Sequence, residues 1–249
     1  MGIIYSYLFL SGLVMGSFFN VVGLRVPKKL SIVRPRSSCP RCKRNLGPLE
    51  LIPVVSFLFQ KGKCKGCLSK ISPIYAVIEF ITAFLFMITP HLIGWSHELL
   101  VAYGLLSLLI IVSISDFVYM IIPDKVLLFF GGYFILVRVI VPLDLWYSPF
   151  LGAAVGFIFL LLIAIISKGG MGGGDIKLFA VLGLVFGYQQ LLLVFFFSTL
   201  CGTIIGLGAL LTGKVKRKQP VPFGPSIAIG SLITYYFSSR ILEWYVNLL

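Results

Sequence analysis

The sequence has little charge and very few acidic residues. Only 12% of its 249 residues are charged, with 8 Asp plus Glu against 21 Lys plus Arg, whereas 59% are hydrophobic. The mean hydropathy is +1.04. These values lie outside the range of soluble domains, so the composition excludes a soluble globular fold and predicts an all-α, polytopic membrane protein. Because acids are so rare, each one needs an explanation.

Histidine is nearly absent. The sequence has two histidines, His91 and His97, and no His-Glu-x-x-His motif, which argues against a zinc metalloprotease of that type. Both histidines fall on the predicted outer side of the membrane, so a serine or cysteine nucleophile on the inner side would lack an imidazole partner. If the chain is a hydrolase, aspartates are the remaining acid–base groups.

Long uncharged segments predict about eight transmembrane helices, within a range of six to eight. A bilayer core of about 30 Å needs roughly 20 apolar residues per helix. The first span, residues 3–24, has no basic segment before it, so we expect a retained helix with its N-terminus outside, not a cleaved signal peptide. The later expected spans are 74–94, 99–115, 125–141, 149–166, a stretch from 178 onward, and 226–247.

One uncharged run is too long for a single crossing. Residues 178–213 would extend about 54 Å as one helix. We therefore expect a break at the sequence GYQQ, residues 187–190. The part before the break is too short to cross the bilayer alone, so Asp175 at its start is expected below the membrane surface, beside a glycine-rich loop.

Basic residues define the expected orientation. Eight crossings would place four segments on one side, and together with Lys125 these hold 19 of the 21 basic residues: 25–73, 116–124, 167–177 and 213–225. By the positive-inside rule this side is the cytoplasm. We accordingly divide the chain into a first transmembrane helix (1–24), a cytoplasmic loop (25–73) and a membrane catalytic domain (74–249).

Two pairs of cysteines stand in the predicted cytoplasmic loop. Cys39 and Cys42 form one C-x2-C pair and Cys64 and Cys67 form another, with 21 residues between them. This spacing is typical of a zinc ribbon, in which four thiolates hold one tetrahedral ion. Two disulfides are the alternative, but cytoplasmic thiols stay reduced. We expect a structural Zn2+ that stabilises a loop too small for a core of its own.

The loop is basic, yet we do not expect it to bind nucleic acid directly. Its cations have no aromatic residues between them on which bases could stack, since Phe57 and Phe59 lie in an apolar stretch. The cations mark the cytoplasmic side and suit contact with anionic membrane lipid.

Two aspartates are the main catalytic candidates. Asp116 ends one apolar run and Asp175 opens another, so both come to the cytoplasmic side on different helices. Such a pair can activate water if one carboxylate takes a proton while the other, protonated, polarises the scissile carbonyl. Because a helix N-terminus favours an anion, the helix dipoles predict Asp175 as the base and Asp116 as the proton-carrying partner.

The other acids have simpler expected roles. Asp124 follows Pro123 at the start of a helix, so we expect it to cap the first turn rather than to act in catalysis. Glu98 and Asp144 fall in short predicted outer loops, where solvated or interfacial charges are expected. Glu79 lies about one turn into a span and should pair with a cation or face the bundle interior.

Four motifs follow one another along nearly the whole chain: GSFFNVVGLRVP at 16–27, the two C-x2-C pairs around ELIPVVSFLFQKGKC at 50–64, DFVYMIIPD at 116–124 and GGGDIK at 172–177. Together they resemble the type IV prepilin peptidases, which are bifunctional leader peptidases and N-methyltransferases. Within that family the chain is most similar to members that process competence pseudopilins in Gram-positive bacteria. The resemblance selects the same aspartates, Asp116 and Asp175.

The resemblance implies an integral-membrane aspartic endopeptidase of the bacterial plasma membrane. Family members cut prepilin and pseudopilin precursors after the glycine that ends a short basic leader, at the cytoplasmic face. Many then methylate the new N-terminal amine with S-adenosylmethionine. Glu50 matches the family acid associated with methylation, although the usual ENIP is ELIP here. Gly172, Gly173 and Gly174 are expected to leave room for an extended substrate to approach.

Two other functions are compatible with parts of the sequence. Intramembrane acids beside a glycine-broken helix also form ion sites, so an ion-coupled membrane transporter is an alternative. An internal repeat would favour the transporter, and the sequence shows none. A membrane-tethered zinc scaffold would explain the cysteines but would leave both aspartates without a role.

Overall fold

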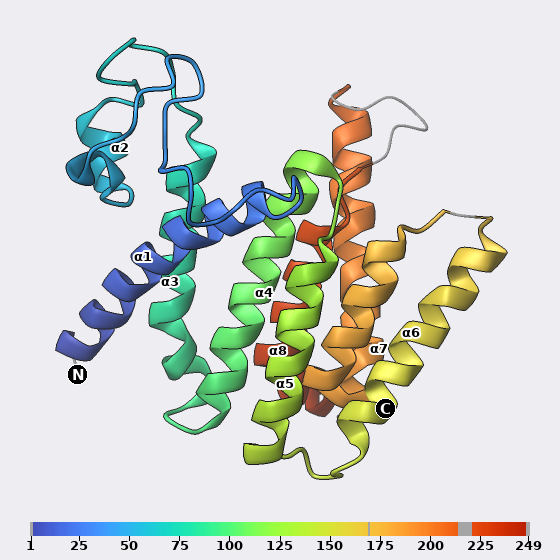
Figure 1. The fold of residues 1–249 in the computed structure, drawn as a ribbon. Helices are drawn as coiled ribbons and strands as arrows, with labels where there is room; N and C mark the ends of the chain where they lie inside the picture. Colours follow the sequence, from blue (N-terminus) through green and yellow to red (C-terminus); the bar gives the residue numbers. More distant parts are fainter. Residues whose placement is uncertain (1, 169, 214–220, 248–249) are drawn as a thin grey trace. The chain divides into compact units, whose positions relative to one another are not determined.

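The computed structural model describes residues 2–168, 170–213 and 221–247 (Figure 1). Within these ranges the chain folds into helices and loops with no β-strand, which confirms the all-α prediction. The chain divides into two compact units, Met1–Trp95 and Ser96–Leu249. Four cations predicted for the inner side lie outside the described residues: Lys214, Lys216, Arg217 and Lys218.

The first unit is a pair of long helices with a loop between them. Its elements are α1 (Gly2–Arg25), the 3-10 helix η1 (Pro48–Leu51), α2 (Val55–Phe59) and α3 (Ile74–Ile93). Glycines allow α1 and α3 to approach closely: a Cβ on Gly12 would lie 2.6 Å from Ala83 Cα, and one on Gly16 would lie 2.8 Å from Glu79 Cα. Small residues four apart are a common packing device between membrane helices.

The second unit is a bundle of five helices. They are α4 (Glu98–Tyr119), α5 (Asp124–Ile140), α6 (Ser148–Ile166), α7 (Gly173–Leu211) and α8 (Gly224–Val246). Helix α4 packs against α5 and α8, and α7 packs against α5, α6 and α8. Buried residues lie on all sides of α4.

Helices α6 and α7 make the closest backbone contact in this unit. A Cβ on Gly183 would lie 2.3 Å from the carbonyl carbon and oxygen of Gly152, and one on Gly152 would lie 2.7 Å from the carbonyl carbon of Gly187. No side chain fits at these positions without separating the two helices. The glycine spacing therefore fixes how α7 lies against α6.

Helix α7 breaks where the sequence predicted. Gly187 has φ 68° and ψ 179°, a conformation that only glycine adopts readily. The helical part before the break, residues 173–186, extends about 21 Å, which is shorter than a bilayer core. The predicted break in the sequence GYQQ is confirmed.

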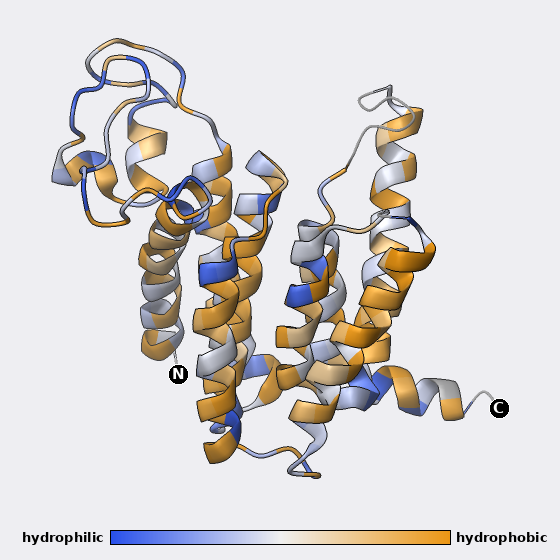
Figure 2. Ribbon diagram, turned by 45° about the vertical axis from the view of Figure 1, so that its right-hand side comes forward, coloured by the Kyte–Doolittle hydropathy of each residue, from blue (hydrophilic) through white to orange (hydrophobic). Residues whose placement is uncertain are grey.

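Several helices have the length and hydropathy needed to cross a membrane. Among the described residues, α1, α3, α4, α6 and α7 meet that requirement. Helix α5 has 17 residues and is shorter than the usual span of about 20. The helices consist mostly of hydrophobic residues, whereas the loop between α1 and α3 includes several hydrophilic stretches (Figure 2). The chain is thus a multi-pass membrane protein, while the count of six to eight crossings stays a prediction.

Candidate active site and zinc-binding cluster

The four cysteines of the first unit converge on one point. The sulfur atoms of Cys39, Cys42, Cys64 and Cys67 all lie within 4.8 Å of one another. The Cys39–Cys67 Sγ distance is 3.8 Å and the Cys42–Cys64 distance is 4.0 Å, too long for disulfides. A tetrahedral ion with Zn–S bonds of about 2.3 Å places its sulfurs about 3.8 Å apart. The cluster therefore fits a zinc ion and does not fit the disulfide alternative.

The two cysteine pairs have the same backbone geometry, 25 residues apart. In the first, Cys39 N–H donates to Arg44 O at 3.0 Å and Lys43 N–H donates to Cys39 O at 2.9 Å. In the second, Cys64 N–H donates to Ser69 O and Leu68 N–H donates to Cys64 O, both at 2.9 Å. The residue after each second cysteine, Lys43 or Leu68, has positive φ. Both pairs thus share one backbone turn, which is suited to presenting two thiols to a metal ion.

Backbone amides prepare one of these thiols for metal binding. Hydrogen bonds from the backbone of Cys42 and then of Arg41 lower the pKa of the Cys39 thiol to about 6. A lowered pKa favours the thiolate, which is the form that binds a metal. Zinc would here have four protein ligands and no open position, which suits a structural ion.

Glu50 is bound into the same loop. Its Oε1 accepts a hydrogen bond from Arg44 Nη2 at 2.7 Å, and its Oε2 accepts one from Gly47 N–H at 2.9 Å. The Arg44 hydrogen bond, followed by that of Gly47, lowers the pKa of the Glu50 carboxyl. Through Arg44, which lies two residues after Cys42, this acid stabilises the first knuckle.

Asp116 lies in the last turn of α4 and is 7% exposed. The helix ends at Tyr119, and its C-cap, Met120, adopts a left-handed conformation. Ser115 Oγ donates to the carbonyl of Ile121 and so fixes the following turn. The backbone N–H of Gly224, the first residue of α8, donates to Asp116 Oδ2 at 2.6 Å. A Cβ on Gly224 would lie 2.9 Å from Asp116 Cβ, so only glycine allows this approach.

Asp175 lies in the first turn of α7 and is partly buried. Gly172 is the N-cap of this helix, while Gly173 and Gly174 are already helical. A Cβ on Gly172 would lie 3.0 Å from Asp175 Oδ2, and one on Gly174 would lie 2.9 Å from Ile122 Cβ. These glycines therefore keep the carboxylate uncovered and allow α7 to approach the segment that follows Asp116.

The fold brings the two aspartates to the same end of the second unit. The contact between Gly174 and Ile122 joins the two segments, and Asp124 forms an ion pair with Lys177 Nζ at 2.8 Å. The first turn of α7, which carries Asp175, thus lies beside the segment that follows Asp116, and the pairing of the two acids stays a prediction.

Asp124 does not have the role that its position predicted. Helix α5 starts at Asp124, its N-cap is Pro123, and no side chain caps the first turn. The Asp124 carboxylate is instead paired with Lys177, and both side chains are more than half exposed. The prediction of a capping aspartate was wrong because Asp124 is already the first helical residue, and Pro123 occupies the N-cap position.

This chain is similar to known proteins over nearly its whole length. The family described as "Bacterial Peptidase A24 N-terminal domain" matches residues 10–92, and the "Type IV leader peptidase family" matches residues 103–207. A protein of Bacillus subtilis (strain 168) named "Prepilin leader peptidase/N-methyltransferase" is 50% identical over 243 residues, which cover 98% of each chain. The chain belongs to the type IV leader peptidase family.

More distant members agree with this assignment. Proteins of the same name from Myxococcus xanthus (strain DK1622) and Pseudomonas aeruginosa are 37% and 32% identical, and the matches cover 88% and 96% of this chain and 68% and 92% of the relatives. No solved structure matches. The leader peptidase family match contains both Asp116 and Asp175, whereas the N-terminal family match contains all four cysteines of the zinc cluster. Membership of a peptidase family favours the enzyme over the transporter and the scaffold.

Two further acids of this family member are buried or paired. Glu79 on α3 is 8% exposed and accepts a hydrogen bond from Val54 N–H at 2.8 Å, which confirms that it faces the interior. Val54 itself has φ 61°, a strained value for a β-branched residue. Glu98 is not a solvated loop charge, because it is the first residue of α4 and forms an ion pair with Arg138. A single arginine inside an apolar span was the sequence signal for this pair.

Proposed function

We propose that this protein is an integral-membrane aspartic endopeptidase that removes the leader from type IV prepilin-like precursors, with Asp116 and Asp175 as its catalytic pair. The observation that carries the proposal is the placement of these two acids at one end of a helical bundle. Each comes from a different helix, and together they belong to a segment that matches the leader peptidase family. The names of the relatives support the prepilin substrate.

A water molecule between the two carboxylates would be the nucleophile. One aspartate accepts a proton from this water as the oxygen attacks the scissile carbonyl carbon. The other, protonated, donates a hydrogen bond to the carbonyl oxygen and so stabilises the tetrahedral intermediate. Transfer of a proton to the peptide nitrogen then allows the C–N bond to break, which leaves a carboxyl group and a free amine.

The helix dipoles do not decide by themselves which of the two acids holds a proton at rest. The dipole argument from sequence considered only α4 and α7, but the start of α8 also points an amide at Asp116. If the two carboxylates come together around a water molecule, they titrate as a coupled unit. The assignment of Asp175 as base stays a prediction.

The glycines before Asp175 suit an extended substrate. Gly172 and Gly173 are exposed, and a Cβ on Gly173 would meet no atom within 4 Å. A peptide bond must lie against both acids to be cut, and residues without side chains leave the acids open from this direction. We propose that Gly172, Gly173 and Gly174 form the approach path.

The finer assignments rest on the family and on charge. We propose that the cut follows the glycine of a short basic leader and that the substrates are competence pseudopilins, as the motif resemblance implies. The basic loop between α1 and α3 supports a cytoplasmic position for the active site by the positive-inside rule. Its cations would contact anionic lipid.

Methylation of the new N-terminus with S-adenosylmethionine is a second proposed activity, because the relatives carry N-methyltransferase in their names. Both oxygens of the Glu50 carboxylate are already bound by Arg44 and Gly47, an arrangement that fits support of the zinc loop rather than contact with the cofactor. We therefore derive no step through S-adenosylmethionine, and Glu50 is proposed to serve methylation through the loop that it stabilises.

Co-expression with a tagged prepilin tests the peptidase. Leader removal, seen as a shift in pilin mass, should disappear in Asp116→Asn and in Asp175→Asn and should persist in Asp124→Asn, which also removes an acid at this end of the unit. Insertion of each variant is compared by its amount in the membrane fraction. Cleavage that survives in either of the first two variants would exclude the proposed pair.

A further inference from the structure

A buried arginine lies at the end of the second unit that is remote from the two aspartates. Arg138 is in the last turn of α5, and its side chain is 5% exposed. Its Nη1 donates to Glu98 Oε2 at 3.1 Å and its Nη2 donates to Glu98 Oε1 at 3.2 Å. The guanidinium therefore binds the carboxylate in a bidentate manner through its two terminal nitrogens. Paired in this way, an arginine binds with a fixed orientation.

The same guanidinium reaches the break in α7. Arg138 Nη2 also donates to the carbonyl oxygen of Val185, two residues before Gly187. Carbonyls in the last turn before a helix break lose their regular amide partners, and that end of the helix dipole is negative. Arg138 therefore caps the C-terminal end of the half-helix 173–186.

Helix α8 joins this cluster through a tyrosine. Tyr235 Oη donates to Glu98 Oε1 at 3.0 Å, and the Tyr235 ring packs edge-on against Phe186 with centroids 5.9 Å apart. Four helices thus meet at one ionic cluster, which consists of Glu98 from α4, Arg138 from α5, the Val185 carbonyl from α7 and Tyr235 from α8.

Three of these helices carry the candidate active site at their other ends. Helix α4 runs about 27 Å from Glu98 to Asp116, and the first half of α7 runs about 15 Å from Val185 to Asp175. Helix α8 begins at Gly224, whose amide binds Asp116, and carries Tyr235 three turns later. A helix resists compression along its axis, so the position of one end sets the position of the other.

We propose that Arg138 is a positioning residue for the aspartate pair. Arg138 binds Glu98 on α4 and the Val185 carbonyl on α7 at the same time. It thereby fixes the axial position of the α7 half-helix, which carries Asp175, relative to α4, which carries Asp116. This inference rests on the proposed function, because it assigns a purpose to the alignment of two acids that are proposed to be catalytic. Arg138 itself touches no part of the active site.

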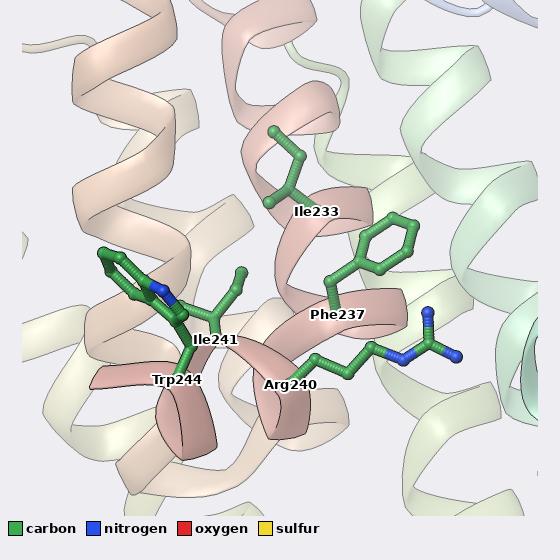
Figure 3. Close-up of a pocket in the computed structure, with 5 residues that line it drawn as sticks. All are labelled: Ile233, Phe237, Arg240, Ile241 and Trp244. Atoms are coloured by element: carbon green, nitrogen blue, oxygen red, sulfur yellow. The ribbon is translucent and has the colours of Figure 1, made fainter. Parts of the chain in front are cut away.

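Kinetics of leader cleavage test this role with the purified full chain in lipid vesicles. For Arg138→Met we expect kcat to fall at least tenfold, because small misplacements of catalytic groups have effects of that size. KM should stay within twofold, since no substrate contact is lost. Arg240→Met is the matched control at the same end of the unit: Arg240 is exposed and lines an open cavity of about 340 Å³ on α8 beside Phe237 and Trp244 (Figure 3). The kcat of Arg240→Met should stay within twofold of the wild-type value.

A conservative variant covers the case in which Arg138→Met is not inserted. In Arg138→Lys a single ammonium cannot hold both Glu98 and the Val185 carbonyl in the geometry of the guanidinium, so kcat should fall several-fold with KM unchanged. Wild-type kcat in whichever of these two variants is inserted would overturn the proposal, as would an equal loss in Arg240→Met. A wild-type protein that cuts no prepilin would instead refute the proposed function.

Discussion

The glycine contact between α6 and α7 makes a quantitative prediction with an internal control. In Gly183→Ala the new Cβ would lie 2.3 Å from the Gly152 carbonyl and 2.4 Å from Ala153 N. Ordinary contacts begin near 3.4 Å, so the helices must separate by about 1 Å, and backbone atoms cannot rotate away. Overpacking of this kind costs about 1 to 3 kcal/mol.

The control substitution is chemically identical and lies in the same helix. Gly206 is in the second part of α7, and a Cβ there would meet no atom within 4 Å. Gly206→Ala should therefore stabilise the protein by up to about 1 kcal/mol, because alanine is the better helix former. The expected changes in the free energy of unfolding therefore have opposite signs, although each variant adds one methyl group.

Thermal unfolding in detergent micelles measures both effects. A change of 1 kcal/mol shifts the midpoint by about 2 to 4 °C for a chain of this size, so Gly183→Ala should lower it by about 2 to 12 °C and Gly206→Ala should raise it by up to about 4 °C. Leader cleavage should fall at least tenfold in Gly183→Ala, because this residue lies in the half-helix of Asp175. An unchanged midpoint in Gly183→Ala, or an equal loss in both variants, would refute the packing argument.

Three further predictions concern the other side chains of the two sites. Cys64→Ser should reduce bound zinc from one ion per chain to well below one, measured by atomic emission, and should expose the basic loop to trypsin; full zinc content in this variant would contradict the four-thiolate site. Asp124→Asn should keep leader cleavage within about fivefold of wild type, since exposed ion pairs contribute at most about 1 kcal/mol; a loss of a hundredfold would make Asp124 catalytic. Glu50→Gln should leave cleavage intact and abolish methylation of the mature pilin, followed by mass spectrometry; a methylated N-terminus would remove Glu50 from that activity.

Local patterns predicted the all-α fold, the α7 break and the convergence of the four cysteines. The C-x2-C spacing defines a knuckle by itself, and Gly187 marks the break because an uncharged run of that length exceeds one bilayer crossing. Asp116 and Asp175 could be paired from their positions at helix ends. Each of these features depends on residues that are close in sequence or on a simple length argument.

Contacts between distant segments could not be predicted in this way. The amide of Gly224 reaches Asp116 across 108 positions, and Arg138 meets Glu98 across 40. The ion pair between Asp124 and Lys177 likewise joins two helices, across 53 positions. Such partners depend on how helices pack, and local sequence patterns do not reveal that packing.

Cleavage by the purified protein tests the central claim most directly. Wild type and the single variants Asp116→Asn and Asp175→Asn are reconstituted in lipid vesicles with zinc and mixed with a synthetic prepilin precursor, and the products are identified by mass spectrometry. The account predicts one cut after the leader glycine by the wild type and none by either variant, although all three hold zinc equally. Cleavage at the same bond by either aspartate variant would contradict it.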